Sequence, residues 1–147
     1  MDIKTVINER YKETEIHVCK DRTDDEVKNI VETLHSMYDT ILTGTDPVGN
    51  RCRIRPAEIF SFYAEAQHVV ALGKDTRYTM NEKLYQLEKL LKSQGFVRIS
   101  KSEIVNFRKI KALDLGITGT IKVILRNGYE TYTSRRNVAR IKELLNQ

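Results

Sequence analysis

The sequence predicts an α+β fold that is mainly β, with a strand-helix extension ahead of a longer β-rich segment. Short runs of β-branched and aromatic residues follow residue 50, and turn residues separate them. Only three segments carry apolar residues at helical spacing. Near the C-terminus, Asn127-Gly128 lies between two β-rich runs, which is the strongest short-range signal for a β-hairpin.

The N-terminal extension is expected to contain one strand and one helix. Ile16 and Val18 alternate with polar residues, which predicts an edge strand. Thr23-Asp24-Asp25-Glu26 has the pattern of a capping box, and apolar residues at spacings of three and four continue a helix over residues 27–41. A cluster of breaker residues at 43–50 then interrupts regular structure.

This breaker cluster marks the expected domain boundary, with an acidic extension at 1–50 and a basic domain at 51–147. Residues 1–50 hold 6 Lys and Arg against 11 Asp and Glu, whereas residues 51–147 hold 19 against 9, a net charge of +10. Positive charge confined to one segment is typical of nucleic-acid binding. It also fits a solubilising surface, since many basic domains bind nothing.

The basic domain divides into short elements. A helix is expected to open at Asn81-Glu82, to place four leucines on one face and to end at Gly95. A Ser-capped turn or helix is expected at 102–106, and the last hairpin runs to Ser134, a good N-cap for a final helix. Strands are expected at residues 53–55, 59–63, 68–72, 76–79, 96–99 and 108–115.

Arg135 and Arg136 occupy the first turn of that final helix. The helix dipole favours acidic residues there, so two arginines are misplaced for helix stability alone. They fit a helix end that faces an external polyanion such as a phosphate backbone, to which Ser134 also leaves backbone N–H groups available. Pairing with Glu130 or Glu143 is the alternative, but it leaves the charge excess unexplained.

Catalytic and metal chemistry is poorly supported. The sequence has no Gly-rich phosphate loop, nucleophile elbow or paired catalytic carboxylates, so we expect no enzyme and no cofactor. His17 and Cys19 share a strand face without further ligands at metal spacing, so a zinc site is not expected. Cys19 and Cys52 fit reduced thiols. With no signal peptide and no apolar span of about 18–20 residues, we expect a cytoplasmic protein.

Three blocks after residue 52 resemble the LytTR family of DNA-binding domains, over roughly two thirds of the chain. The resemblance implies an elongated, predominantly β domain of a bacterial transcription regulator. Such a domain contacts the major groove with loops that project from its strands, not with a recognition helix. The blocks are Glu58-Ile59-Phe60 leading to His68; Leu84 to Leu91 followed by residues 96–106; and Asn127-Gly128 followed by Ser134-Arg135-Arg136.

The same resemblance places three candidate DNA contacts. His68 occupies a position where the family has a DNA-contacting side chain, and Lys101 one where members often have Asn, Lys or Arg on DNA. Arg136 matches an arginine that the family uses on a base edge. An arginine can donate two hydrogen bonds to guanine O6 and N7, which is worth about 1–3 kcal/mol of discrimination.

Two further candidates have supporting roles by resemblance, and a third departs from the family pattern. Arg98 and Arg135 resemble contacts to the DNA backbone. Ser100 stands where many members have His, and its short hydroxyl reaches less far toward a base.

The resemblance also implies partners. The DNA-binding domain would bind double-stranded promoter DNA as two copies, hence a homodimer. The extension at 1–50 is too short for a phospho-acceptor receiver domain, and stand-alone members are associated with a small membrane protein that restrains them. The acidic helix at 24–42 is therefore a candidate surface for such an inhibitor or for dimerisation. Alternatively, its apolar stripe packs on the β domain.

Two other functions stay open at this stage. One is a protein-interaction module whose basic face docks an acidic partner. The other is an RNA binder, although Tyr129 and Tyr132 fall on opposite strand faces and form no stacking pair.

Overall fold

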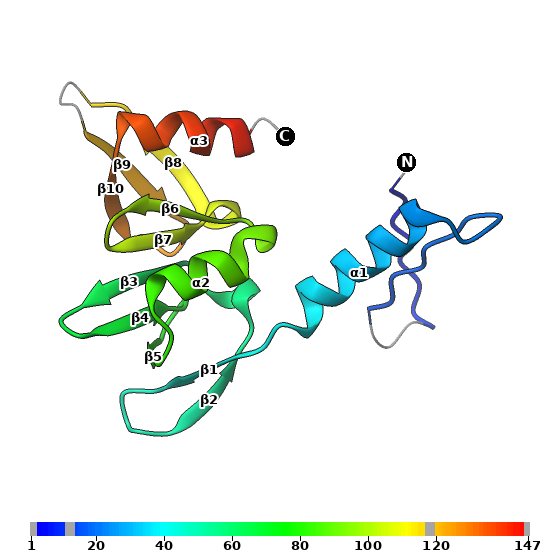
Figure 1. The fold of residues 1–147 in the computed structure, drawn as a ribbon, viewed down its shortest axis with the longest axis horizontal. Coiled ribbons are helices and arrows are strands. Elements are labelled where there is room, and N and C mark those ends of the chain that lie inside the picture. The colour runs from blue at the N-terminus through cyan, green and yellow to red at the C-terminus, as the bar shows by residue number, and fades with distance from the viewer. Residues whose placement is uncertain (1–2, 11–13, 117–119, 146–147) are drawn as a thin grey trace. The chain divides into compact units, whose positions relative to one another are not determined.

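The computed structural model describes residues 3–10, 14–116 and 120–145 (Figure 1). The chain divides into two compact units, Met1–Ser36 and Met37–Gln147. This division differs from the expected boundary at residue 50. The first strand of the second unit, β1, forms within residues 42–45 and pairs with strands beyond residue 50.

The first unit contains most of one helix, α1 (Asp25–Asp39). It begins at Asp25 because the Oδ1 atom of Asp24 accepts a hydrogen bond from the backbone N–H of Val27 at 3.1 Å, as an N-cap does. The predicted helix is thus confirmed. The predicted edge strand is wrong, because residues 14–20 adopt no strand and no second strand in the described part of this unit offers a ladder partner.

The second unit is built on a seven-stranded antiparallel sheet with the order β2-β1-β5-β4-β3-β7-β6 (Figure 1). Gly44 explains why the breaker cluster can hold strand β1, since a Cβ atom there would lie 2.6 Å from Cδ1 of Ile54. The strands are β1 (Leu42–Thr45), β2 (Arg51–Ile54), β3 (Ser61–Glu65), β4 (His68–Leu72), β5 (Arg77–Met80), β6 (Phe96–Ser100) and β7 (Glu103–Asn106).

Strand β7 replaces the predicted turn or helix at 102–106. All four of its residues are buried, because the strand packs on both faces. Ile104 belongs to one apolar cluster and Val105 to another, so the alternation of a half-exposed strand is absent from the sequence.

A second, three-stranded sheet has the order β10-β9-β8, formed by β8 (Ile110–Asp114), β9 (Thr120–Leu125) and β10 (Glu130–Ser134). The predicted hairpin at Asn127-Gly128 is confirmed: Gly128 has a φ of 87°, and the backbone N–H of Leu125 donates to the carbonyl of Tyr129 at 2.9 Å. Helix α3 (Arg135–Leu145) follows β10 directly.

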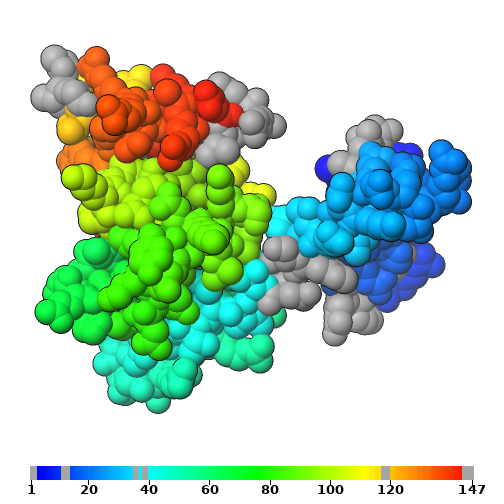
Figure 2. Space-filling model, in the orientation of Figure 1, coloured from blue at the N-terminus to red at the C-terminus, as the bar shows by residue number. Residues whose placement is uncertain are grey.

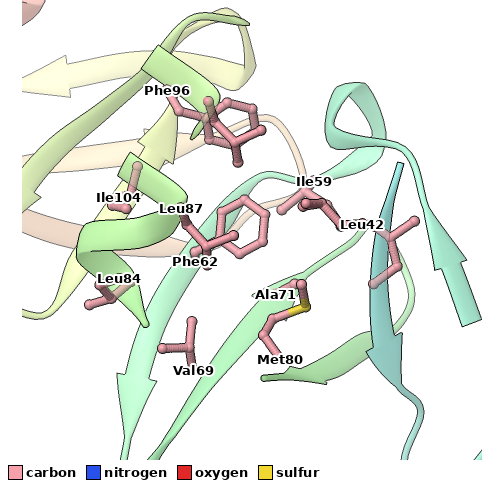
Figure 3. Close-up of a cluster of buried hydrophobic side chains, with 12 residues drawn as sticks. Leu42, Ile59, Phe62, Val69, Ala71, Met80, Leu84, Leu87, Phe96 and Ile104 are labelled. Atoms are coloured by element: carbon pink, nitrogen blue, oxygen red, sulfur yellow. The ribbon is translucent and has the colours of Figure 1, made fainter. Parts of the chain in front are cut away.

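Two apolar clusters hold the second unit together. In the first, α2 (Leu84–Leu91) covers the seven-stranded sheet, and Figure 3 shows Leu87 beside the ring of Phe62. The second joins β6 and β7 to the three-stranded sheet and to α3 through Ile141. Strand β6 serves both clusters by alternation, with Phe96 in the first and Val97 in the second. Short 3₁₀ turns at Pro56–Glu58, Lys92–Gln94 and Phe107–Lys109 connect these elements.

None of the helices within the described ranges combines the length and the apolar character that a membrane crossing requires.

Candidate nucleic-acid interface

Three connections carry the predicted contact residues: the β3–β4 turn, the β6–β7 turn and the β10–α3 junction. They lie along the same edge of the second unit, on the left in Figure 1. Backbone contact joins the first two, since the N–H of Ala64 donates to the carbonyl of Ser102 at 2.8 Å. We call these three connections the rim.

Side-chain contacts join the β6–β7 turn to the β10–α3 junction. The carbonyl of Ile99 accepts hydrogen bonds from Oγ1 of Thr133 and from Nδ2 of Asn137, each at 2.8 Å. Asn137 directly follows Arg136, and Ile99 precedes Ser100 and Lys101. The rim is therefore continuous through hydrogen bonds, and Figure 2 shows its elements as one closed surface from the green β3–β4 hairpin to the orange start of α3.

His68 and Lys101 are both exposed and line one shallow surface depression. His68 is the first residue of β4, immediately after a two-residue connection in which Ala66 has a φ of 54°. Lys101 is at the tip of the β6–β7 turn. The fold thus brings together two side chains that are 33 positions apart in the chain.

Arg98 lines the same depression as His68 and Lys101, but its guanidinium donates to acceptors of the protein itself. Its Nε donates to the carbonyl of Ser100 at 2.7 Å, and its Nη2 donates to the carbonyl of Lys101 at 2.5 Å. Its Nη1 donates to Oε2 of Glu88 on α2 at 3.1 Å. Since these three bonds use all three guanidinium nitrogens, Arg98 is less available to a phosphate than the sequence indicates.

Ser100 is likewise engaged within the turn. Its Oγ accepts a hydrogen bond from the backbone N–H of Ser102 at 3.2 Å and lies 3.3 Å from the Oγ of Ser102. The pairing of β6 with β7 shifts register between Arg98 and Ser100, which is a β-bulge. A bulge reorients the following side chains, here those of the turn that carries Lys101.

The β10–α3 junction presents its predicted residues to solvent. Ser134 ends β10, and Arg135 and Arg136 open α3, all three exposed. No carboxylate among the described residues pairs with either arginine, and Glu130 pairs instead with Lys122 at 3.5 Å. Arg135 lines a separate depression beside Lys142, so the structure does not group it with His68 and Lys101.

Sequence reasoning missed four residues of this edge. Lys83 and Tyr85, near the start of α2, line the same depression as His68, and Tyr85 is 68% exposed. A lone lysine and a lone tyrosine carry no sequence signal. Thr133 and Asn137 were missed because their partner, the Ile99 carbonyl, is a backbone atom more than 30 residues away.

A buried carboxylate lies directly behind the β6–β7 turn and joins the two sheets. Oε1 of Glu103 accepts from the Ser61 hydroxyl on β3 at 2.5 Å, and its Oε2 accepts from the Thr131 hydroxyl on β10. Tyr129 stacks on Tyr63 with ring centroids 6.1 Å apart. Burial, and then the negative charge of Glu103, raise the pKa of Tyr129 to about 12.

Metal ligands do not gather in the described ranges, where no group of three or more His, Cys, Asp or Glu side chains could hold an ion. The chemistry of this edge is therefore that of exposed hydrogen-bond donors and positive charges on turns.

Residues 49–146 match the LytTr DNA-binding domain family. The chain belongs to the LytTR family. Its match is to a DNA-binding domain and not to an enzyme family, as the sequence indicated, and the family match begins close to the expected boundary at residue 50.

Full-length relatives resemble the whole chain, including the extension. The uncharacterized HTH-type transcriptional regulator SAS2254 of Staphylococcus aureus strain MSSA476 is 32% identical over 146 residues, which cover 99% of this chain and 98% of that protein. The regulator SAOUHSC_02645 of strain NCTC 8325 matches with the same identity and coverage. In this LytTR chain, however, α2 and α3 are separated by the strands β6 to β10 and form no helix-turn-helix pair.

A solved structure has the same fold as the second unit. The LytTr DNA-binding domain of a putative methyl-accepting/DNA response regulator from Bacillus cereus superposes with a TM-score of 0.65 at 21% identity. The superposition covers 74% of this chain and 98% of that one. The mainly β second unit, with α2 and α3, thus has the LytTR domain fold.

Proposed function

We propose that this LytTR chain is a cytoplasmic transcription regulator that binds promoter DNA by sequence and contacts the major groove with the turns of its rim. Membership of a DNA-binding family supports the nucleic-acid part of the proposal. Relatives that are named as transcriptional regulators, and that match this chain over nearly their full length, support the regulatory part. The observation that carries the major-groove part is that His68 and Lys101 line one depression while Arg136 stands exposed at a linked junction.

The three proposed base contacts differ in what they can recognise. Arg136 can donate two hydrogen bonds to guanine O6 and N7. Lys101 can donate to a single base acceptor or to a phosphate, and His68 can donate or accept according to its tautomer. Because the three side chains lie on separate connections, each is expected to contact a different base position.

The +10 charge of residues 51–147 supplies the nonspecific part of binding. Lys83 adds a cation to the depression that holds His68 and Lys101. Tyr85 beside it offers its ring to a sugar and its hydroxyl to a phosphate. These residues position the duplex, and the rim distinguishes sequences.

The proposal is tested by selecting bound sequences from random duplex DNA at moderate salt. We expect a spaced repeat of a short motif, since two copies would occupy two half-sites. Single-stranded DNA, RNA and acidic polypeptide serve as competitors. Equal competition by any of them, with no enriched motif, would contradict sequence-specific binding and favour the RNA or protein-docking function.

Arg136 is tested next on the selected site. Arg136→Ala should cost about 1–3 kcal/mol and relax preference at one base position. Arg53→Ala is the matched control, because Arg53 is an exposed arginine on β2, outside the rim. Any loss from the control should be uniform across sequences. An Arg136→Ala protein with unchanged preference at every position would show that Arg136 reads no base.

We also propose that residues 1–36 mediate pairing of two copies. Ile3, Val6 and Ile7 are 87%, 73% and 94% exposed, which is a high exposure for three neighbouring apolar side chains. A small membrane-protein inhibitor is the competing occupant of this unit.

Deletion of residues 1–36 tests the role of the extension. It keeps β1, which a cut at residue 48 would remove from the sheet. Sedimentation should show a folded monomer. This monomer should bind one DNA half-site and should have lost cooperative binding to two half-sites. A deleted protein that still dimerises would contradict pairing through the extension, and one that fails to fold would show that the extension packs on the β domain.

A further inference from the structure

Arg98 joins three elements that the DNA-binding proposal otherwise treats separately. It starts on β6, reaches Glu88 on α2 and bonds the carbonyls of Ser100 and Lys101 in the β6–β7 turn. Its side chain is 24% exposed and that of Glu88 is 40% exposed, so the ion pair is partly shielded from solvent. Partial shielding lets such a pair hold a fixed geometry better than a fully exposed one.

The position of Arg98 follows from the alternation of β6. Phe96 packs in the cluster under α2, so Arg98, two residues on, lies on the same face of the strand and meets Glu88. The planar guanidinium presents its donors as a rigid fork. That fork spans the bulge and ends on two consecutive carbonyls of the turn.

We propose that the Glu88–Arg98 pair is a positioning device that fixes the β6–β7 turn and thereby sets the base preference of Lys101. The inference rests on the proposed function, since it assumes that Lys101 contacts DNA. Arg98 itself does not contact the duplex: its role is to hold the carbonyls of Ser100 and Lys101 so that the Lys101 side chain leaves the turn in one direction. Glu88 holds the guanidinium in place.

A second set of hydrogen bonds holds β6 just before this turn. The carbonyl of Ile99 is held by Thr133 and Asn137 from the β10–α3 side. Three consecutive carbonyls thus accept side-chain hydrogen bonds. Thr133 donates to that of Ile99, and Arg98 donates to those of Ser100 and Lys101. At this tip the Lys101 side chain is exposed, and no carboxylate among the described residues pairs with it.

Glu88→Gln gives the sharpest test, because the two roles of Arg98 predict opposite signs. If Arg98 were a phosphate contact, removal of the neighbouring acid would free the guanidinium and reduce repulsion, so DNA affinity would rise. If Arg98 positions the turn, the affinity for the selected site should fall by about threefold to tenfold, the worth of one ordinary net hydrogen bond. Glu58→Gln is the matched control for lost negative charge, because Glu58 is exposed and forms no ion pair with another described residue.

Arg98→Lys is the second variant and keeps the charge. A lysine cannot reproduce the fork, so a similar loss of affinity is expected with an unchanged dependence on salt. Retained affinity in Arg98→Lys, or higher affinity in Glu88→Gln than in Glu58→Gln, would overturn the proposal. Thermal unfolding of each variant confirms that the compared proteins are folded.

A Lys101→Ala background separates the device from a general structural role. The device acts through Lys101, so Glu88→Gln should relax preference at the base position of Lys101 and have no added effect once Lys101 is removed. Additive losses would overturn the inference. If Lys101→Ala alone leaves binding unchanged, the assigned site of the proposed function fails; if Lys101→Ala weakens binding but Glu88→Gln does not, only the positioning device fails.

Discussion

The β6–β7 turn and the β10–α3 junction both carry an arginine that the family resemblance places near DNA, yet the two arginines are in opposite situations. Arg98 has three hydrogen-bond acceptors within the protein. Arg136 is exposed and has no carboxylate partner among the described residues. One connection is therefore held by its arginine, whereas the arginine of the other is exposed to solvent and has no carboxylate partner among the described residues.

The two regions are also linked, through Asn137 and the carbonyl of Ile99. A held turn and an open junction at a fixed separation can present two cations to two base positions at a constant spacing. Affinity gains from such preorganisation because fewer side chains need to be ordered on binding.

A substitution at the start of β6, the strand that leads into the β6–β7 turn, should have the largest effect on stability. Gly95 precedes β6 with a φ of 82°, and a Cβ atom there would lie 2.3 Å from Cε1 of Phe107. Gly95→Ala should lower the free energy of unfolding by about 3 kcal/mol, through backbone strain and the clash together. Denaturant unfolding of the full chain measures it.

Gly49→Ala is the control for that variant. Gly49 also has a positive φ, of 101°, but has no atom within 4 Å of a built Cβ. It should show only the backbone part of the loss. Equal losses in the two variants would mean that β6 and the Phe107 ring can move apart without cost.

Cutting the link between the regions should have a smaller effect. Asn137→Ala removes one of the two donors to the Ile99 carbonyl, and Thr133 remains as the other. We expect a loss of about 1 kcal/mol in the free energy of unfolding, typical of one hydrogen bond. Arg140→Ala, an exposed position on the same helix, should be neutral in the same denaturation experiment. An equally neutral Asn137→Ala would indicate that the hydrogen bond from Asn137 to the Ile99 carbonyl does not stabilise the protein.

The contacts of Tyr129 behind the β6–β7 turn should affect the free energy of unfolding in a pH-dependent way only at alkaline pH. The pKa of Tyr129 is raised to about 12, above the ordinary value near 10 in an unfolded chain. A raised pKa means that the stabilising contribution is complete below about pH 10 and is lost as the pH rises toward 12. Unfolding measured from pH 8 to pH 12 should therefore show a steeper fall for the parent than for Tyr129→Phe. Parallel curves would contradict the assigned surroundings of the phenol.

The smallest effect is expected from Arg135. It lines the depression beside Lys142 and resembles a backbone contact, so Arg135→Ala should weaken binding to all sequences alike. The slope of log affinity against log salt should fall by about 0.9, the share of one phosphate contact. A change of base preference in this variant would show that Arg135 contacts a base and not only the DNA backbone.

The sequence predicted much of this fold because local signals and tertiary structure agree at most positions. Asn127-Gly128 fits the hairpin, and the leucines of α2 fit a covering helix. Strand β7 was missed because burial on both faces erases alternation, and β1 because Gly44 is in a strand for a packing reason that only the neighbouring Ile54 reveals.

The site was predictable only in part. The resemblance predicts Lys101, His68 and Arg136 as DNA contacts. The fold brings His68 and Lys101 into one depression. The contacts of Arg98 were not predictable, because two of its partners are backbone carbonyls and the third, Glu88, follows from the packing of α2 on β6. A positive charge looks the same in a sequence whether it is bonded internally or offered to DNA.

The most direct measurement is a matrix of affinities: His68→Ala, Lys101→Ala and Arg136→Ala, each titrated against every single base-pair variant of the selected site. We expect each substitution to flatten the preference at one base position, and the three positions to differ and to keep a constant spacing. Uniform weakening across all sites by all three substitutions would contradict this expectation, since the rim would then supply charge to the backbone and no sequence discrimination.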